Sequence, residues 1–383
     1  MKVLINGLTL KVGGARTVLV GTLKALARYA PEHEYLVYAS TRLDPPMPPL
    51  PPNFEIRHLP RVERSGALVF LWEQLELPRI ARRERVDAMY SMCSGHGPAL
   101  PGVRQVLALH NPTWFVGREE GIPGLPRPGA AARRALARLA VAGSDRVLVQ
   151  TRAMAARVVK FIPEAAAKIV VSPQGAPEFE EVPRLEADRR TLRERLDRFR
   201  ERREFVVLSA GFYERHKDLE TLLDAFEIAS RKDARLGLVL TLDPAWCPEA
   251  RALAARAESP GLRERVLLTG AVPHALMPEV YGAADLFCFP SLLESFGLPM
   301  VEAMSFGLPI LAADTPVNRE VCREAAVYHR SFDASDLAGS LVTLAGNAVT
   351  RDNLAARARE RARAFNSEAH ALALVTSLGI PSA

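Results

Sequence analysis

The sequence predicts an α/β protein with two doubly wound, Rossmann-like domains that face a cleft. Three observations predict this fold class. The chain has 383 residues, which is more than one domain usually needs. Short apolar runs alternate with helical runs, and this alternation is typical of parallel sheets covered by helices on both faces. The alternation stops at a charged segment near the middle of the chain and then begins again. This interruption predicts two domains.

The first predicted domain, at 1–175, contains seven apolar runs of strand length. Helical runs are expected between some of them, at 15–29, 68–83, 130–142 and 151–161. The predicted strands are 2–6, 35–39, 54–59, 87–92, 104–110, 145–150 and 168–172.

The segment 176–204 is expected to link the two domains. The turn-rich run GAPEFEEVP leads into it, and a highly charged helical run that is too short for a coiled coil completes it. We therefore predict a linker followed by an exposed helix.

The second predicted domain, at 205–365, repeats the alternation of strands and helices. Its strands are predicted at 205–210, 236–242, 265–270, 285–290 and 309–313. Parallel sheets of this kind bind ligands beyond the carboxyl ends of their strands. With two such domains, the natural binding site is the cleft between them.

Charge is unevenly distributed along the chain. Residues 1–180 hold 24 Lys and Arg against 15 Asp and Glu, a net of +9, whereas residues 181–383 hold 26 against 29. The arginines on predicted helices of the first half form either ordinary solvated surface or a surface that attracts an anionic membrane or a phosphorylated acceptor. Nucleic acid is not an expected partner, because aromatic residues are not interleaved with these charges.

The cysteines and the hydropathy indicate neither a metal site, nor a disulfide, nor a membrane span. The cysteines lie far apart, and no apolar run reaches the roughly 18 residues that cross a bilayer. We therefore expect free thiols and a cytoplasmic protein that can lie at the inner face of a membrane. The cysteines are Cys93, Cys247, Cys288 and Cys322.

Two carboxylates, Glu294 and Glu302, stand eight positions apart in the run PSLLESFGLPMVEAMSFGLPI. A strand that ends in a glycine-containing turn and opens a helix presents N–H groups and the positive end of the helix dipole to an anion. Phe296, Gly297 and Leu298 are expected to form this phosphate site. Glu294, before the turn, suits sugar hydroxyls, and Glu302, about two helical turns further on, suits a ribose diol. Together they predict a nucleotide-sugar ligand.

From Pro290 to Ile310 the chain matches the pattern P-S-x-x-E-[GS]-F-G-L-P-x-x-E-A-M-x-x-G-x-P-[VI]. In this stretch it resembles the retaining glycosyltransferase family four, which has the E-x7-E signature and the glycosyltransferase-B fold. The resemblance implies that Ser295 also contacts the donor. It further implies that the last helix, at about 366–383, crosses back to pack on the first domain.

A cationic loop follows the first strand of the second domain. Lys217 and Arg215 are expected to project from it toward the phosphates and to neutralise a departing diphosphate. The family usually has an arginine directly after the glycine of this loop. Here Phe212 follows Gly211, so Arg215 is expected to take that role.

The resemblance assigns further positions in the first domain. Gly14 and Arg16, in and after a Gly-Gly turn, are implied to approach the donor's diphosphate. His110, at the end of the fifth predicted strand, is implied to lie near the reacting sugar, although Asn111 replaces the usual aspartate.

These features predict a retaining glycosyltransferase, a hexosyltransferase, that moves a sugar from a nucleotide-sugar donor to a glycan or lipid-linked acceptor in cell-envelope synthesis. The chain has no D-x-D motif, so neither a metal nor another cofactor is expected. Glu294 would act as a nucleophile, or it would position the sugar while the departing phosphate takes the acceptor's proton. The alternatives are a nucleotide-sugar epimerase of the same fold and a non-catalytic binder of nucleotide-sugars.

Overall fold

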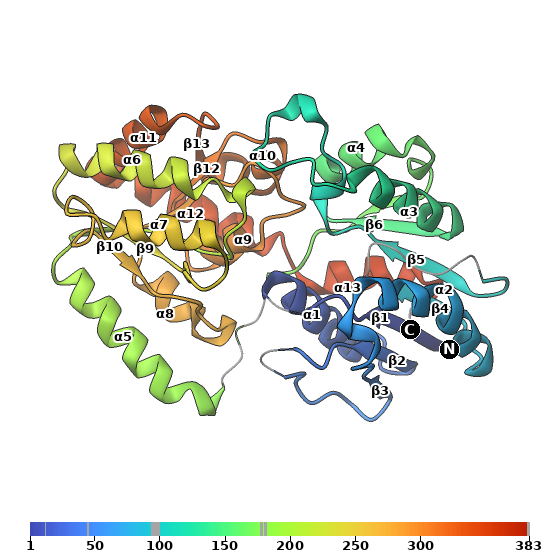
Figure 1. The fold of residues 1–383 in the computed structure, drawn as a ribbon. Coiled ribbons are helices and arrows are strands. Elements are labelled where there is room, and N and C mark those ends of the chain that lie inside the picture. The colour runs from blue at the N-terminus through green and yellow to red at the C-terminus, as the bar shows by residue number, and fades with distance from the viewer. Residues whose placement is uncertain (12, 44–45, 93–99, 177–178, 180–181, 381–383) are drawn as a thin grey trace. The chain divides into compact units, whose positions relative to one another are not determined.

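The computed structural model describes residues 1–383 except 12, 44–45, 93–99, 177–178, 180–181 and 381–383. The chain divides into two compact units (Figure 1). The first unit comprises Met1–Gly121, Leu125–Gly175 and Phe365–Ala383, and the second comprises Ile122–Gly124 and Ala176–Ala364. Each unit is built around one parallel sheet, so the predicted fold class is confirmed.

The first unit contains a seven-stranded parallel sheet in the order β3-β2-β1-β4-β5-β6-β7. All seven strands predicted for this half are present. The strands are β1 (Lys2–Gly7), β2 (Glu34–Ala39), β3 (Phe54–Arg57), β4 (Ala88–Ser91), β5 (Arg104–Ala108), β6 (Arg146–Val149) and β7 (Ile169–Val171).

Helices cover both faces of this sheet. Leu374 and Leu378 of the last helix are buried in one cluster with Val3 and Ile5 of β1, so the end of the chain completes the first unit. The helices are α1 (Gly13–Tyr29), α2 (Gly66–Arg83), α3 (Ala130–Gly143), α4 (Arg152–Phe161) and α13 (Ser367–Ser377).

The second unit contains a six-stranded parallel sheet in the order β10-β9-β8-β11-β12-β13. The five predicted strands are present, and the sequence analysis missed the sixth, the edge strand β13. The strands are β8 (Phe205–Ser209), β9 (Leu236–Leu240), β10 (Val266–Leu268), β11 (Leu286–Phe289), β12 (Ile310–Ala313) and β13 (Ala326–His329).

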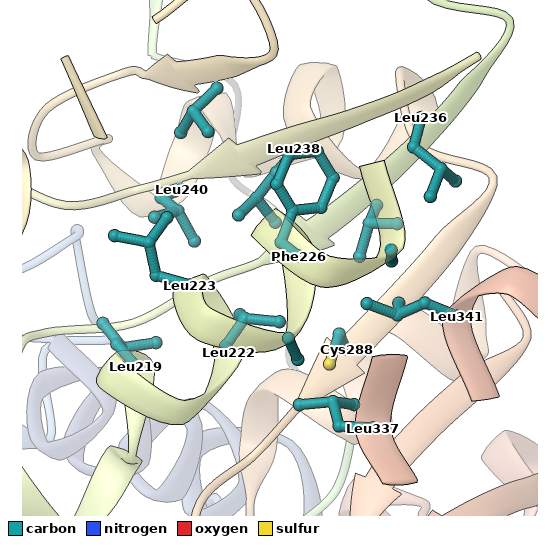
Figure 2. Packing of buried hydrophobic residues seen from close by; sticks show 14 of the residues in the cluster. Leu219, Leu222, Leu223, Phe226, Leu236, Leu238, Leu240, Cys288, Leu337 and Leu341 are labelled. Carbon is teal, nitrogen blue, oxygen red and sulfur yellow. The ribbon is translucent and has the colours of Figure 1, made fainter. Parts of the chain in front are cut away.

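Helix α6 lies in the centre of the second unit's core (Figure 2). Its Phe226 points toward Leu238 of β9, and its Leu222 lies on the side nearer Leu337 of the neighbouring helix α11. The helices of this unit are α5 (Glu186–Arg200), α6 (Leu219–Lys232), α7 (Pro248–Ala257), α8 (Met277–Gly282), α9 (Leu298–Ser305), α10 (Pro316–Cys322), α11 (Ala334–Gly346) and α12 (Ala348–Arg363).

The charged helix α5 packs onto the second unit and does not stand apart as a linker. Leu192, Leu196 and Phe199 are buried along one side of it, at the spacing of a single helical face. Arg193 adds an ion pair with Glu279 of α8 at 2.8 Å. The many charged residues of α5 therefore lie on its outer face, and its inner face is apolar.

The described cysteines are free thiols: Cys288 and Cys322 are buried, and Cys247 is partly buried. Cys93 lies outside the described residues. Within the described ranges, no group of three His, Cys, Asp or Glu side chains could hold a metal ion. Among the described helices, none combines the length and hydropathy needed to cross a membrane.

Candidate active site in the second unit

The candidate site lies at the carboxyl ends of β8, β9 and β11. Strand β8 sits between the other two. The chain leaves β8 toward β9 and leaves β11 toward β12, in the opposite direction, so β8 and β11 flank the switch point where parallel sheets bind ligands. A pocket opens at this point. It is lined by Gly211 after β8, Thr241 after β9, Ser291 after β11, and Lys217.

Lys217 and Glu294 meet beside this pocket. The Lys217 ammonium lies 2.5 Å from Oε1 of Glu294, and the Ser291 hydroxyl donates to the same oxygen at 2.8 Å. Both charged side chains are largely shielded, with exposed fractions of 19% and 15%. Lys217 also lies over the Phe289 ring at 5.3 Å, in cation–π geometry. These contacts hold one cation and one carboxylate in fixed positions.

Glu294 is kept ionised by its neighbours. Burial acts to raise the pKa of this carboxyl group, but the charges of Lys217 and His216 and the hydrogen bonds from Lys217 and Ser291 outweigh it. The net effect lowers the pKa of Glu294 below its ordinary value. Both hydrogen bonds go to Oε1, so neither of these two donors occupies Oε2.

Gly297 forms the sharp turn that opens α9. Its φ of 87° is in the left-handed region, and a Cβ there would lie 2.5 Å from Cε of Met300. Helix α9 then begins at Leu298, with Pro299 in its first turn. Glu294 and Ser295 precede the turn, which presents the first N–H groups of α9 beyond β11.

Glu302 is buried at 6% exposure and lies in a cluster of its own. The Tyr281 hydroxyl donates to its Oε2 at 2.6 Å, and Nε2 of His274 lies 3.1 Å from Oε1. Phe179 stacks on the His274 ring at 4.8 Å, and Phe306 stacks on Tyr281 at 5.2 Å. A carboxylate has about four acceptor positions, so these two contacts leave Glu302 able to accept from a diol.

Arg215 does not join Lys217 and Glu294. Its guanidinium pairs with Glu249 of α7 at 2.8 Å, and more than half of its side chain is exposed. Arg215 begins a short 3-10 helix, Arg215–Lys217, and the two cations leave this turn toward different partners. The structure therefore brings one of the two predicted loop cations to the carboxylate.

The predicted residues of the first unit occupy separate places in it. His110 hydrogen-bonds Gln150 where β5 and β6 end, and burial, with a smaller effect of His370, lowers the pKa of His110 to about 3. It is therefore a neutral imidazole at physiological pH. Gly14 is exposed in the first turn of α1, and Arg16 donates to the Pro46 carbonyl at 3.1 Å.

The sequence analysis missed two residues that contact Glu302, His274 and Tyr281, and it missed Phe179, which stacks on His274. His274 and Tyr281 lie more than 20 positions before Glu302, and Phe179 lies further away still. Helical or strand periodicity does not link such distant positions. Ser291, which donates to Glu294, was not named as a site residue either, but it had a sequence signal because it lies inside the matched pattern.

Comparisons with known proteins agree with this division of the chain. A family model described as "Glycosyl transferases group 1" matches residues 191–363, and one described as "Glycosyltransferase Family 4" matches residues 12–177. Together the two models account for most of both units.

Two related proteins carry informative names. A D-inositol 3-phosphate glycosyltransferase of Xylanimonas cellulosilytica is 27% identical over 95% of this chain and 90% of its own length. A phosphatidyl-myo-inositol mannosyltransferase of Mycobacterium leprae is 35% identical, over 29% of this chain and 30% of its own length. The second match thus covers less than a third of that relative.

Solved structures share the whole fold. A sucrose-phosphate synthase from Thermosynechococcus elongatus superposes with a TM-score of 0.77 at 20% identity, covering 98% of both chains. Anabaena Alr3699/HepE in complex with UDP-glucose gives a TM-score of 0.74 at 18% identity over 99% of both chains. At these identities the likeness shows the fold.

Proposed function

We propose that this chain, a glycosyltransferase by its domains and fold, transfers a hexose from a nucleotide-sugar to an acceptor hydroxyl with retention of configuration. Its family 4 domain is followed by a group 1 domain, and it has the glycosyltransferase-B fold. The observation that carries the proposal is the Lys217–Glu294 pair at the switch point of the second sheet.

The donor binds in the second unit. Glu302 receives the ribose hydroxyls, and the turn at Phe296, Gly297 and Leu298 receives the diphosphate, with Ser295 beside it. This assignment is supported by the buried carboxylate of Glu302 and by the left-handed Gly297 that exposes the start of α9. Phosphate at a helix N-terminus gains both hydrogen bonds and the favourable end of the helix dipole.

The chemical step breaks the bond between the anomeric carbon and the diphosphate oxygen and forms a bond to the acceptor oxygen. Lys217 and the start of α9 stabilise the negative charge that develops on the diphosphate, which takes the acceptor's proton. Glu294 holds the sugar through Oε2 and stabilises positive charge on the ring. Its ion pair and lowered pKa support this positioning role over nucleophilic attack, because a stabilised carboxylate is a weaker nucleophile. The proposed chemistry needs no metal.

Lys217 is the cation that stabilises the departing diphosphate. Arg215 contributes only if its ion pair with Glu249 breaks. Gly14 and His110 serve the donor from the first unit. The neutral imidazole of His110 suits hydrogen bonding to a sugar hydroxyl.

The acceptor is proposed to be a glycan or lipid-linked molecule of the cell envelope, reached at the inner face of a membrane. The basic first unit supports this, with 24 Lys and Arg against 14 Asp and Glu. The name of one relative, a phosphatidyl-myo-inositol mannosyltransferase, points in the same direction.

Calorimetric titration with UDP, GDP, ADP and their sugars tests the donor assignment, beside Glu302→Ala. Saturable binding of one nucleotide without added metal, weakened at least about tenfold in the variant, is the expected result, since a charge-assisted hydrogen bond contributes about 1.5–3 kcal/mol. Failure of every nucleotide to bind the intact protein would reject the proposal.

A further inference from the structure

Helix α2 exposes a row of leucines to solvent. Leu68, Leu71 and Leu75 have exposed fractions of 43%, 50% and 54%. Their spacing of three and four residues places them along one side of the helix. The opposite side carries Leu77 and Ala81, which are buried against the first sheet. Helix α2 therefore has two apolar sides, and the first unit covers only one of them.

Two arginines continue this row toward the end of the helix. Arg79 and Arg82 follow Leu75 at intervals of four and three residues, and both are exposed. Arg79 pairs with Glu76 at 2.5 Å, but an exposed pair on one helix contributes little. We call Leu68, Leu71, Leu75, Arg79 and Arg82 the α2 stripe.

Helix α3 exposes leucines on the same face of the sheet. Met89 of β4 packs with Trp72 of α2, and Leu107 of β5 packs with Ala137 of α3. Met89 is in register with Gln105, two positions before Leu107, so both side chains point to one face. Leu139 of α3 is 70% exposed on that face.

We propose that the α2 stripe, with Leu139 of α3, docks the first unit on the surface of an anionic lipid bilayer. The leucines enter the boundary between headgroups and acyl chains, and the arginines bind lipid phosphates. We infer an anionic bilayer, and not another apolar partner, because its charge is complementary to that of the first unit. The first unit holds ten more basic than acidic residues, 24 against 14, and the cations stand in line with the apolar groups.

This inference rests on the part of the proposed function that brings the chain to a membrane, and it names the surface that makes the contact. The surface is separate from the donor site, because the stripe belongs to the first unit and Lys217, Glu294 and Glu302 belong to the second. Vesicle binding and nucleotide binding are therefore measured independently, and one can fail without the other.

Vesicle flotation of the full chain tests the proposal, without nucleotide or acceptor. The vesicles contain phosphatidylcholine with about one third phosphatidylglycerol, or phosphatidylcholine alone. We expect binding to the anionic vesicles only. The double variant Leu71→Ser with Leu75→Ser should lower the partition coefficient at least about tenfold. Arg79→Gln with Arg82→Gln should lower it roughly 20-fold, and added salt should weaken the binding of the intact chain.

The matched control is Val349→Ser on α12, because Val349 is 71% exposed but lies in the second unit. It should bind vesicles as the intact chain does. Thermal unfolding and nucleotide affinity, unchanged in all variants, would show that they remain folded. Absence of vesicle binding, or equal binding by the leucine variant, would overturn the proposal. A dimer in sedimentation that the leucine variant abolishes, without vesicle binding, would overturn it in favour of a contact between two copies.

Discussion

Glu294 depends on Lys217 for its charge. Lys217 lowers the pKa of Glu294 against the opposing effect of burial, and Glu294 compensates the ammonium inside a shielded site. The carboxylate is charged above its folded-state pKa, which lies below the ordinary value of 4.5. The rate of nucleotide-sugar turnover should therefore show no acid limb from Glu294 with a midpoint at or above pH 4.5. An acid limb near pH 6 that disappears in Glu294→Gln would contradict this pKa assignment.

His274 is predicted to position Glu302 for the donor. His274→Leu removes a contact to a buried carboxylate and should raise the KM for the nucleotide-sugar about five- to tenfold, with kcat nearly unchanged. His274→Gln keeps a donor group and should restore most of the affinity. Steady-state kinetics of both variants checks this prediction. Equal KM values for the two variants would assign His274 a packing role against Phe179 only.

At the scale of the elements, α9 depends on the left-handed turn at Gly297. Gly297→Ala places a Cβ at φ 87° and close to Met300, and it should cost about 1–2 kcal/mol of unfolding free energy and weaken nucleotide binding. Gly339→Ala is the control, because a Cβ at Gly339 of α11 would meet nothing within 4 Å. The control should be neutral or stabilising. Denaturant titration and calorimetry of both variants provide the comparison, and equal effects would contradict the assignment.

Helix α13 is predicted to make the first unit sensitive to acid. His370 of α13 hydrogen-bonds Ser172 at 2.8 Å, and burial lowers its pKa from 6.5 to about 4. Between these two pH values the unfolded chain binds more protons than the folded one, so the free energy of unfolding falls as the pH falls. The loss from pH 6.5 to 4 should be on the order of 3 kcal/mol and should shrink in His370→Gln. Thermal unfolding across this pH range tests it, and an unchanged slope in the variant would refute it.

Elements with strong local patterns were predictable, and the weaker ones were not. Twelve strands were expected from apolar runs and are present. Strand β13 has only four residues, and its two central side chains are partly exposed at the sheet edge, so it shows no alternation of buried and exposed positions that would mark a strand. Helix α5 was judged by its charges, although Leu192, Leu196 and Phe199 already stood at helical spacing.

At the scale of the whole molecule, the chain ends in the unit where it began. Leu374 of α13 is fully buried in the cluster that contains β1, so Leu374→Ala should destabilise the first unit by about 2–5 kcal/mol. Leu372→Ala on the same helix, 44% exposed, is the control and should cost little. Hydrogen exchange followed by proteolysis and mass spectrometry should show the loss of protection in the first unit. Loss confined to the second unit would contradict the division described above.

The candidate site was predictable where its residues are close in sequence. Glu294, Gly297 and Glu302 lie within one strand–turn–helix, and the lysine loop follows its own strand. The setting of each carboxylate was not predictable, because it is assembled from distant segments. Tyr281 of α8 donates to Glu302, and Arg215 pairs with Glu249 of α7. Both contacts depend on how the helices of the second unit pack, which local sequence patterns do not show.

The most direct test of the central claim is release of nucleoside diphosphate from the bound donor in the absence of acceptor. It is measured by chromatography for the intact chain and for Lys217→Ala with the nucleotide-sugar that binds. Slow hydrolysis by the intact chain should fall about 10²- to 10³-fold in Lys217→Ala, while donor affinity changes far less, because the cation acts on charge that develops in the transition state. Release at an equal rate from both proteins, or none from the intact chain with any donor, would contradict the claim.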